Sequence, residues 1–417
     1  MSEEAGLVLV FLQRPPLGLL ALVGTIIIPV NGPSNVNATM VLVALLLGLW
    51  LFDMMVRQRQ IRLAPSAPIR PLLALVIVPV LAFGMGQLPW YTFARPAPMG
   101  AQLGGLSIFI LSAGVFLLVG HQVRDTRWLG WLTWLFVGLG AVYIAGRFLP
   151  PLGGLTRRLF TGQATGSMFW TWLVAVSLGQ AIYNRRMDMR LRLALGAIAA
   201  ATLYVGIVQT QGWKSGWVPP VVVALALVGL RSWRMALLLA VGGLALAPDA
   251  VSQLIASDQY SYSTRLDAWL IVVEIVKVNP VLGLGPANYH WYTPLFPIRG
   301  YAVQFNSHNQ YVDLVAQAGL LGLGAFLWFA WEIGRLGWRL RTRVAEGFEQ
   351  AYVYAAVAGL AGTMVSAMMG DWVLPFFYNI TLGGFRASML PWLFLGGLVV
   401  LEQQLRPADN VEGEGQA

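Results

Sequence analysis

The stretch QLGGLSIFILSAGVFLLVG, at residues 102–120, contains no charged side chain. An α-helix rises about 1.5 Å per residue, so roughly 20 apolar residues cross the hydrocarbon core of a bilayer, which is about 30 Å thick. A continuous apolar run of this length is typical of a transmembrane helix, and residues 102–120 are predicted to form one.

Apolar runs of the same kind recur along the whole chain. They predict about twelve membrane spans, at 16–30, 38–56, 71–87, 102–120, 128–149, 165–183, 191–209, 216–230, 233–247, 319–338, 350–370 and 387–402. The composition agrees, because 57% of the 417 residues are hydrophobic and only 11% are charged, whereas soluble domains carry about 25% charged residues. The expected fold class is therefore an all-α polytopic membrane protein.

Arginine residues mark alternate connections between these spans. The basic connections follow the second, fourth, sixth, eighth and tenth spans, with Arg57, Arg59, Arg62 and Arg70; Arg124 and Arg127; Arg185, Arg186, Arg190 and Arg192; Arg231 and Arg234; and Arg335, Arg339, Arg341 and Arg343. Positively charged connections stay on the cytoplasmic side of a membrane. The pattern therefore predicts that these connections and both termini are cytoplasmic.

The net charge of +9 does not indicate a nucleic-acid partner. The basic residues lie between apolar runs and do not form one patch or tail, which a nucleic-acid interface would need. Membrane lipid is the partner that this distribution favours. The chain has no cysteine, which excludes disulfides, thiolate metal sites and a thiol nucleophile.

The predicted spans divide the chain into four regions. These are a transmembrane bundle with spans one to nine at 1–247, a large outward loop at 248–318, spans ten to twelve at 319–402, and a polar cytoplasmic tail, expected to be disordered, at 403–417. A loop as long as the second region is uncommon in a compact protein and usually carries function.

The large loop contains a helix signal of its own. Thr264 is followed three positions later by Asp267, as in a capping box, and apolar residues then recur at helical spacing until Pro280. We expect this amphipathic helix to lie along the outer membrane–water interface.

Several cations fall on the predicted outward side, which should be poor in them: Arg95, Arg147, Arg157, Arg158, Lys214, Arg265, Lys277, Arg299 and Arg386. Taken singly, each is typical of a residue that anchors a helix at the lipid headgroups. Taken as a set, they favour an anionic ligand delivered from the membrane plane, above all a lipid diphosphate, because guanidinium and ammonium groups both bind phosphate oxygens.

The remaining candidates for chemistry are few. Of the three histidines, His308 stands just ahead of the tenth span, where a neutral imidazole could take a proton near neutral pH. His121 and His290 are interpreted as structural. The stretch GLGPAN, from Gly283, follows a predicted interfacial helix and not a strand, so it is not expected to bind a dinucleotide. No cluster of carboxylates or imidazoles predicts a metal site.

The large loop resembles the O-antigen ligase and O-antigen polymerase superfamily. The ligase pattern is His, then Asn, Ser or Gln, nine residues, Gly, two residues, and Gly, Thr or Tyr. This sequence matches it at His308, Asn309, Gly319 and Gly322. Upstream, STRLDAWLIVVEIVKVNPVLGLGPANY is similar to the stretch that carries the essential loop arginine of the family.

The resemblance implies roles for individual residues. His308 would be the catalytic base, supported by Asn309, and Arg265 would bind the donor diphosphate. In TQGWKSGWV, Lys214 stands where the family has a second arginine, so the charge is kept and the guanidinium fork is lost. The stretch RRLFTGQATGS resembles the outward approach to the sixth span and adds Arg158. The implied fold resembles that of the C-type glycosyltransferases, with one large periplasmic loop.

The implied activity is inverting glycosyl transfer without metal or cofactor, at the outer face of the bacterial inner membrane. An undecaprenyl-diphosphate-linked glycan would be the donor. The acceptor would be lipid A–core in a ligase or a lipid-linked repeat unit in a polymerase, and the full match of the His pattern favours the ligase. A protein O-oligosaccharyltransferase is disfavoured by the short chain. A transporter of lipid-linked anions predicts a midplane site between repeated halves, and the sequence has no such repeat.

Overall fold

The structure is a computed structural model that describes residues 11, 13–246 and 259–406. Within these ranges the regular elements are helices, accompanied by isolated bridges between Asn31 and Asn37 and between Ile298 and Tyr301. Helices satisfy their backbone hydrogen bonds within one segment, which a lipid environment requires. The prediction of an all-α fold is confirmed for the described residues.

The α-helices are α2 (Pro15–Gly24), α3 (Ala38–Phe52), α4 (Ile69–Met85), α5 (Met99–Gln122), α6 (Thr126–Phe148), α7 (Pro150–Leu159), α8 (Ser167–Tyr183), α9 (Met189–Tyr204), α10 (Lys214–Arg231), α11 (Trp233–Leu246), α13 (Gln259–Val276), α14 (Tyr289–Tyr292), α15 (Gln310–Leu340), α16 (Phe348–Met369) and α17 (Phe385–Gln404). Short 3-10 turns include η4 (Gly162–Thr165) and η7 (Leu382–Gly384), and π-helical turns extend α3 at Asp53–Arg57 and α9 at Val205–Gln209.

Four of these helices begin at an Asn or Asp whose side chain accepts a backbone N–H of the first turn. The capping residues are Asn37 before α3, Asp125 before α6, Asp188 before α9 and Asn309 before α15. Each satisfies a donor that the helix itself leaves unpaired. The starts of these helices are therefore local properties of the sequence.

Each of the twelve predicted spans overlaps a helix of the structure, although α15 begins at Gln310, nine residues before the expected start of the tenth span. Eight of the described helices are long and apolar enough to cross a membrane: 38–57, 99–122, 126–148, 189–209, 214–231, 310–340, 348–369 and 382–404. Shorter apolar helices lie at 15–27, 69–85 and 233–243, and α8 spans 17 residues. The chain is thus a multi-pass membrane protein, and twelve crossings remain a prediction.

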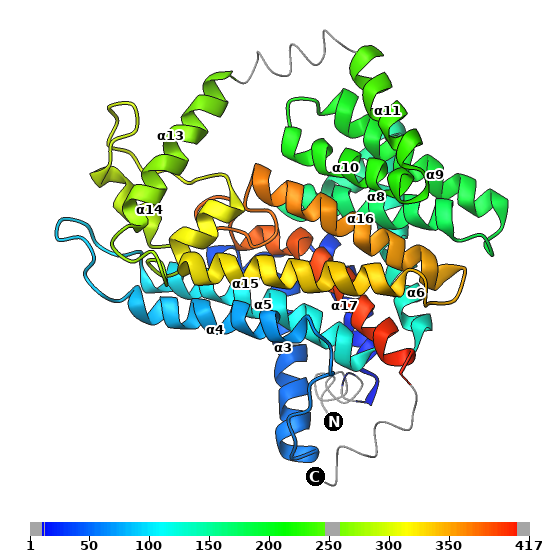
Figure 1. Ribbon diagram of the computed structural model, residues 1–417, viewed down its shortest axis with the longest axis horizontal. Helices are drawn as coiled ribbons and strands as arrows, with labels where there is room; N and C mark the ends of the chain where they lie inside the picture. Colours follow the sequence, from blue (N-terminus) through cyan, green and yellow to red (C-terminus); the bar gives the residue numbers. More distant parts are fainter. Residues whose placement is uncertain (1–10, 12, 247–258, 407–417) are drawn as a thin grey trace.

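The helix α17 lies at the centre of the bundle, with α5, α8, α15 and α16 around it (Figure 1). Every residue of this helix from Phe385 to Leu401 is buried. Trp392 stacks on Phe329 of α15, and Phe394 stacks on Trp172 of α8. Aromatic contacts of this kind add to the energy of apolar burial. The last helix of the chain therefore joins the layers of the bundle.

Large apolar side chains cover the outside of several helices. Leu238 of α11 is 66% exposed and Trp331 of α15 is 64% exposed. Apolar surface of this extent would be unfavourable in water and is favourable against acyl chains. The exterior thus agrees with the apolar composition.

Two expectations need correction. The loop helix α13 begins at Gln259, five residues before the expected cap, so Thr264 lies inside it. Asp267 accepts a hydrogen bond from Arg299 Nε at 2.8 Å, and this tertiary contact replaces the expected capping box. At the other end of the chain, α17 continues to Gln404, two residues into the expected tail. Residues 407–417 of that tail lie outside the described residues, as do residues 247–258 at the start of the loop.

Candidate active site

His308 lies in a tight turn directly before α15. Its φ of 49° is unusual for a residue with a side chain. Ser307 and Asn309, on either side of it, are buried. The Ser307 hydroxyl accepts the Asn309 N–H at 3.0 Å and donates to the Asp313 carboxylate at 2.8 Å. The partly buried imidazole is therefore held by hydrogen bonds of its neighbours, as strained residues at functional sites commonly are.

The spacing of the His motif has a structural explanation. Asn309 caps α15, because its side chain accepts the backbone N–H groups of Tyr311 and Val312. At Gly319 the helix is interrupted, with φ 68° and ψ −171°. The backbone of residues 280–285 lies against this break, where Leu284 N donates to Ala316 O at 2.9 Å.

The glycines of GLGPAN take part in the same contact. Gly283 and Gly285 have φ of 70° and 87°, values that glycine adopts at little cost. A Cβ on Gly283 would lie 2.6 Å from Gly319 N. These glycines turn the chain after Pro280, and the turn packs the loop onto α15.

Helix α13 is attached to the His308 turn by a tryptophan. Trp269 Nε1 donates to the Ser307 carbonyl oxygen at 2.7 Å. Arg265 lies one helical turn earlier, and its positive charge acts on His308. The pKa of His308 is lowered, first by burial and second by this charge. Both effects favour the neutral imidazole, which is the form that can act as a base.

Two residues of the connection between α16 and α17 complete this site. The Asn379 amide nitrogen lies 3.2 Å from His308 Nδ1 and also donates to the Asp371 carboxylate. Asp371 is fully buried and accepts the Phe376 N–H at 2.6 Å. Burial raises the pKa of Asp371.

Asp371 and Asn379 form a relay to His308, and the orientation of the Asn379 amide decides which tautomer of the imidazole it stabilises. An ionised carboxylate only accepts hydrogen bonds, so the Asn379 nitrogen gives one N–H to Asp371 and directs the other at Nδ1 of the imidazole. Nδ1 is then an acceptor, and the neutral ring carries its proton on Nε2.

A second buried carboxylate lies beneath the turn. Asp313 accepts hydrogen bonds from Tyr289 Oη at 2.5 Å and from Ser307 Oγ. Burial and the Asp313 charge raise the pKa of Tyr289, which keeps this phenol protonated as a donor. Asp313 thus holds Ser307, next to His308 in the chain, and Asp371 holds Asn379, which contacts the imidazole.

Lys214 is the first residue of α10, and the structure brings it toward the same connection. The adjacent Trp213 ring lies 5.7 Å from the ring of Trp372, which follows Asp371 in the chain. Ser167 Oγ, at the start of α8, donates to the Ser215 carbonyl oxygen at 2.5 Å. The start of α10 is thereby held next to the segment that carries the Asp371–Asn379 relay.

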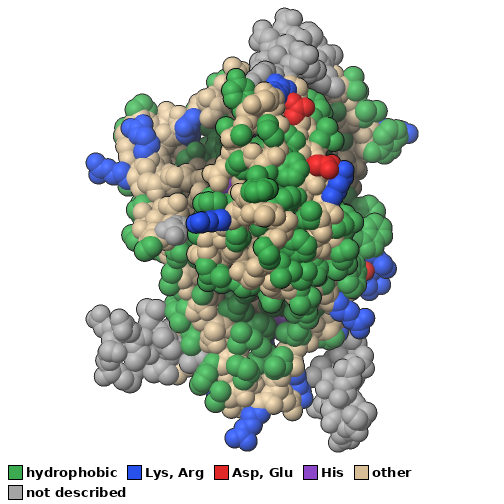
Figure 2. Space-filling view, turned by 90° about the vertical axis from the view of Figure 1, so that its left-hand side faces the viewer, with side chains coloured by type: hydrophobic (Ala, Val, Ile, Leu, Met, Phe, Trp, Pro, Cys, Tyr) green, Lys and Arg blue, Asp and Glu red, His purple; other side chains and the backbone are tan. Residues whose placement is uncertain are grey.

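The other outward cations differ in their surroundings. Arg158 lies exposed in the last turn of α7, and no contact of the structure links it to His308. Lys277 pairs with Glu274 and Arg299 with Asp267. Figure 2 shows the end of the molecule that carries α13, where Lys and Arg side chains are spread over the face and acidic ones are few.

Unlike these cations, Arg386 is buried and only 1% exposed. Its guanidinium donates to the carbonyl oxygens of Ile28 at 3.2 Å and Gly383 at 3.5 Å. It joins the first apolar helix to the start of α17.

The other two histidines have structural surroundings. His290 stacks on Tyr378 with ring centroids 4.4 Å apart, and its Nδ1 is 2.8 Å from the Phe305 carbonyl oxygen. His121 Nδ1 is 2.8 Å from the Leu117 carbonyl oxygen, and its Nε2 accepts the Ala64 N–H at 2.6 Å. These contacts agree with the structural interpretation of both residues.

The sequence analysis missed Asp371 and Asn379. Asp371 is the single carboxylate in the connection at 371–384, and a lone acid among apolar residues on the predicted outward side is a signal that could have found it. Asn379 carries no such signal. It becomes part of the site only because the connection folds back over the His308 turn.

Residues 189–327 match the family described as O-antigen ligase. The matched part runs from the start of α9 into α15 and includes Lys214, Arg265, the His308 turn and Gly319. No curated protein matches the chain. Residues 189–327 thus match an O-antigen ligase domain, and this match supports the O-antigen ligase and polymerase superfamily for that part of the chain.

Proposed function

We propose that this protein is an inverting, metal-independent O-antigen ligase of the bacterial inner membrane. In this proposal the chain crosses the membrane twelve times with both termini in the cytoplasm, and residues 248–318 are periplasmic. The donor is a glycan on undecaprenyl diphosphate, and the acceptor is a sugar hydroxyl of lipid A–core. The observation that carries the proposal is the His308 turn, which lies inside the O-antigen ligase domain and contacts both helix α13, the helix of Arg265, and the Asp371–Asn379 relay.

In the proposed reaction the acceptor oxygen attacks the anomeric carbon of the donor. The bond from this oxygen to the anomeric carbon forms with inversion, and the bond from that carbon to the diphosphate oxygen breaks. The acceptor proton passes to His308, a transfer typically worth about 10²–10⁴ in rate. Undecaprenyl diphosphate leaves with the electron pair, and Arg265, Lys214 and Arg158 bind the developing negative charge.

A base at Nε2 of His308 needs a free electron pair there, so the ring proton must sit on Nδ1. Turning the Asn379 amide by half a revolution presents its oxygen to that proton. A protonated Asp371 can then donate to the same oxygen, and because burial raises the pKa of Asp371 to about 6, this form gains population as the pH falls toward 6. In this turned orientation the relay holds the tautomer that can accept the substrate proton, whereas the orientation in the structure holds the other tautomer.

A purified-protein assay tests the proposal. The full-length protein is mixed with a defined undecaprenyl-diphosphate glycan and with either lipid A–core or a second lipid-linked repeat unit. We expect transfer to lipid A–core; elongation of the repeat unit alone would instead assign a polymerase. Transport of the lipid-linked glycan between leaflets without bond formation would refute the enzymatic proposal.

Matched variants separate catalysis from folding. His308→Ala should abolish transfer, whereas His290→Gln should retain it. Lys214→Gln should raise the KM for the donor and Lys214→Arg should restore it, while the exposed control Arg95→Gln should behave as wild type. Full activity in a folded His308→Ala protein would remove the proposed mechanism.

A further inference from the structure

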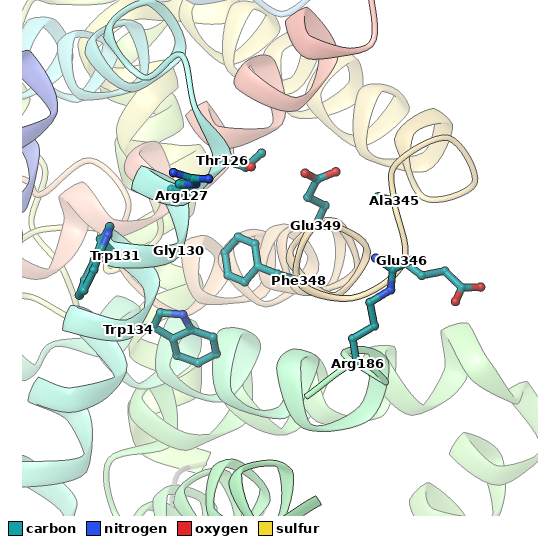
Figure 3. Close-up of a pocket in the computed structure, with 10 residues that line it drawn as sticks. All are labelled: Thr126, Arg127, Gly130, Trp131, Trp134, Arg186, Ala345, Glu346, Phe348 and Glu349. Carbon is teal, nitrogen blue, oxygen red and sulfur yellow. The ribbon is translucent and has the colours of Figure 1, made fainter. Parts of the chain in front are cut away.

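A hollow of about 550 Å³ lies at the opposite side of the bundle from the His308 turn, where three connections of the chain meet. It is formed by the start of α6, the connection before α9 and the connection from α15 into α16. Figure 3 shows the residues that line it. Its size is in the range of small-molecule sites.

The floor of the hollow is aromatic. The rings of Trp134 and Phe348 are 6.0 Å apart and tilted by 55°. Trp131, one helical turn before Trp134, is 63% exposed on the outside of α6. The hollow therefore continues onto the apolar surface of a candidate span, and its floor can hold the glycerol and upper acyl part of a lipid.

Charged groups of both signs stand above this floor. In Figure 3 Arg127 and the Glu349 carboxylate lie on the same side of the hollow, and Arg186 rises from another wall. The stem of Arg186 packs on Gly347, where a Cβ would lie 3.1 Å from Arg186 Cδ. Glu346 points away in this view.

These charges are available to a ligand. The ion pair of Arg127 with Asp125 is 3.9 Å long between side chains that are 87% and 53% exposed, and pairs of this kind contribute little. Within the described part of the chain, Glu349 and Arg186 form no ion pair. A ligand can thus engage a cation and a carboxylate without breaking a strong contact.

The position of the hollow points to a lipid headgroup. Both α6 and α16 are candidate membrane spans that begin at it. The hollow also lies among the arginine-rich connections, which face the cytoplasmic leaflet under the positive-inside rule. Basic pockets between helices on this side are typical headgroup sites.

From these observations we propose that the hollow binds phosphatidylethanolamine. The phosphodiester binds Arg127 and Arg186, and the primary ammonium donates to Glu349. A purely anionic headgroup would be repelled by Glu349, and a quaternary ammonium has no N–H to donate to it. This site is separate from the His308 turn and does not depend on the proposed activity.

Native mass spectrometry of the full-length protein tests this proposal. The delipidated protein is titrated with phosphatidylethanolamine, phosphatidylglycerol and phosphatidylcholine of identical acyl chains, and retained lipid is counted. We expect the ethanolamine lipid to be retained best. Glu349→Gln should remove a preference of about three- to fivefold over phosphatidylglycerol, as for a partly exposed ion pair, and Arg127→Gln should weaken retention of all three lipids.

Glu346→Gln is the matched control, because it removes a neighbouring carboxylate that points away from the hollow, and it should keep the preference. Three results would overturn the proposal. They are equal retention of all three lipids by the wild-type protein, an unchanged lipid preference in Glu349→Gln, or an equal loss of that preference in Glu349→Gln and in the control Glu346→Gln. Better retention of phosphatidylcholine would also overturn it, because the aromatic floor and not Glu349 would then recognise the headgroup.

Discussion

Gly319→Ala tests whether the glycine of the His308 motif is required by backbone geometry. The φ of 68° and ψ of −171° at Gly319 lie in a region that is essentially limited to glycine. A Cβ at this position would be 2.1 Å from the Val281 carbonyl oxygen. Backbone strain of about 1–3 kcal/mol and overpacking of about 1–3 kcal/mol add to a cost of about 2–6 kcal/mol.

Such a cost is similar in size to the four backbone hydrogen bonds, worth about 0.5–1.5 kcal/mol each, that hold residues 280–285 on α15. We therefore expect the substitution to lower the unfolding temperature in detergent and to reduce transfer to lipid A–core. Gly324→Ala is the matched control on the same helix, because a Cβ there would meet no atom within 4 Å. If Gly319→Ala is as stable and as active as Gly324→Ala, the geometric explanation of the motif is wrong.

Three further predictions concern the surroundings of His308. Because the charge of Arg265 lowers the pKa of the imidazole, Arg265→Gln should raise that pKa and move the acid limb of kcat/KM to higher pH, which a pH profile of both proteins checks. Trp269→Phe removes a partly buried hydrogen bond worth about 0.5–1.5 kcal/mol, so kcat should fall about tenfold or less while the unfolding temperature changes little. Asp371→Asn can still donate to the oxygen of Asn379 and should keep more activity than Asp371→Ala, measured at saturating donor; equal loss in both would show that the carboxylate charge is needed.

The helical fold could be predicted because its causes are local. A run such as 102–120 needs lipid around it whatever its neighbours are, and caps such as Asn37 and Asp188 set helix starts within one turn. His308 could be found because its motif is continuous in sequence. The same local reasoning misplaced the start of α13, since Asp267 is used by Arg299 from more than 30 positions away in the chain.

Composition and the order of apolar and basic segments were sufficient to specify a multi-pass helical protein, and one continuous motif was sufficient to identify the candidate base. The surroundings of that base required the folded chain. Asp371 and Asn379 reach His308 only after α16 and α17 have packed on α15, and the break at Gly319 exists only because residues 280–285 dock there. Apolar burial in lipid depends on each segment alone, whereas a hydrogen-bonded site depends on distances between segments that no single stretch of sequence contains.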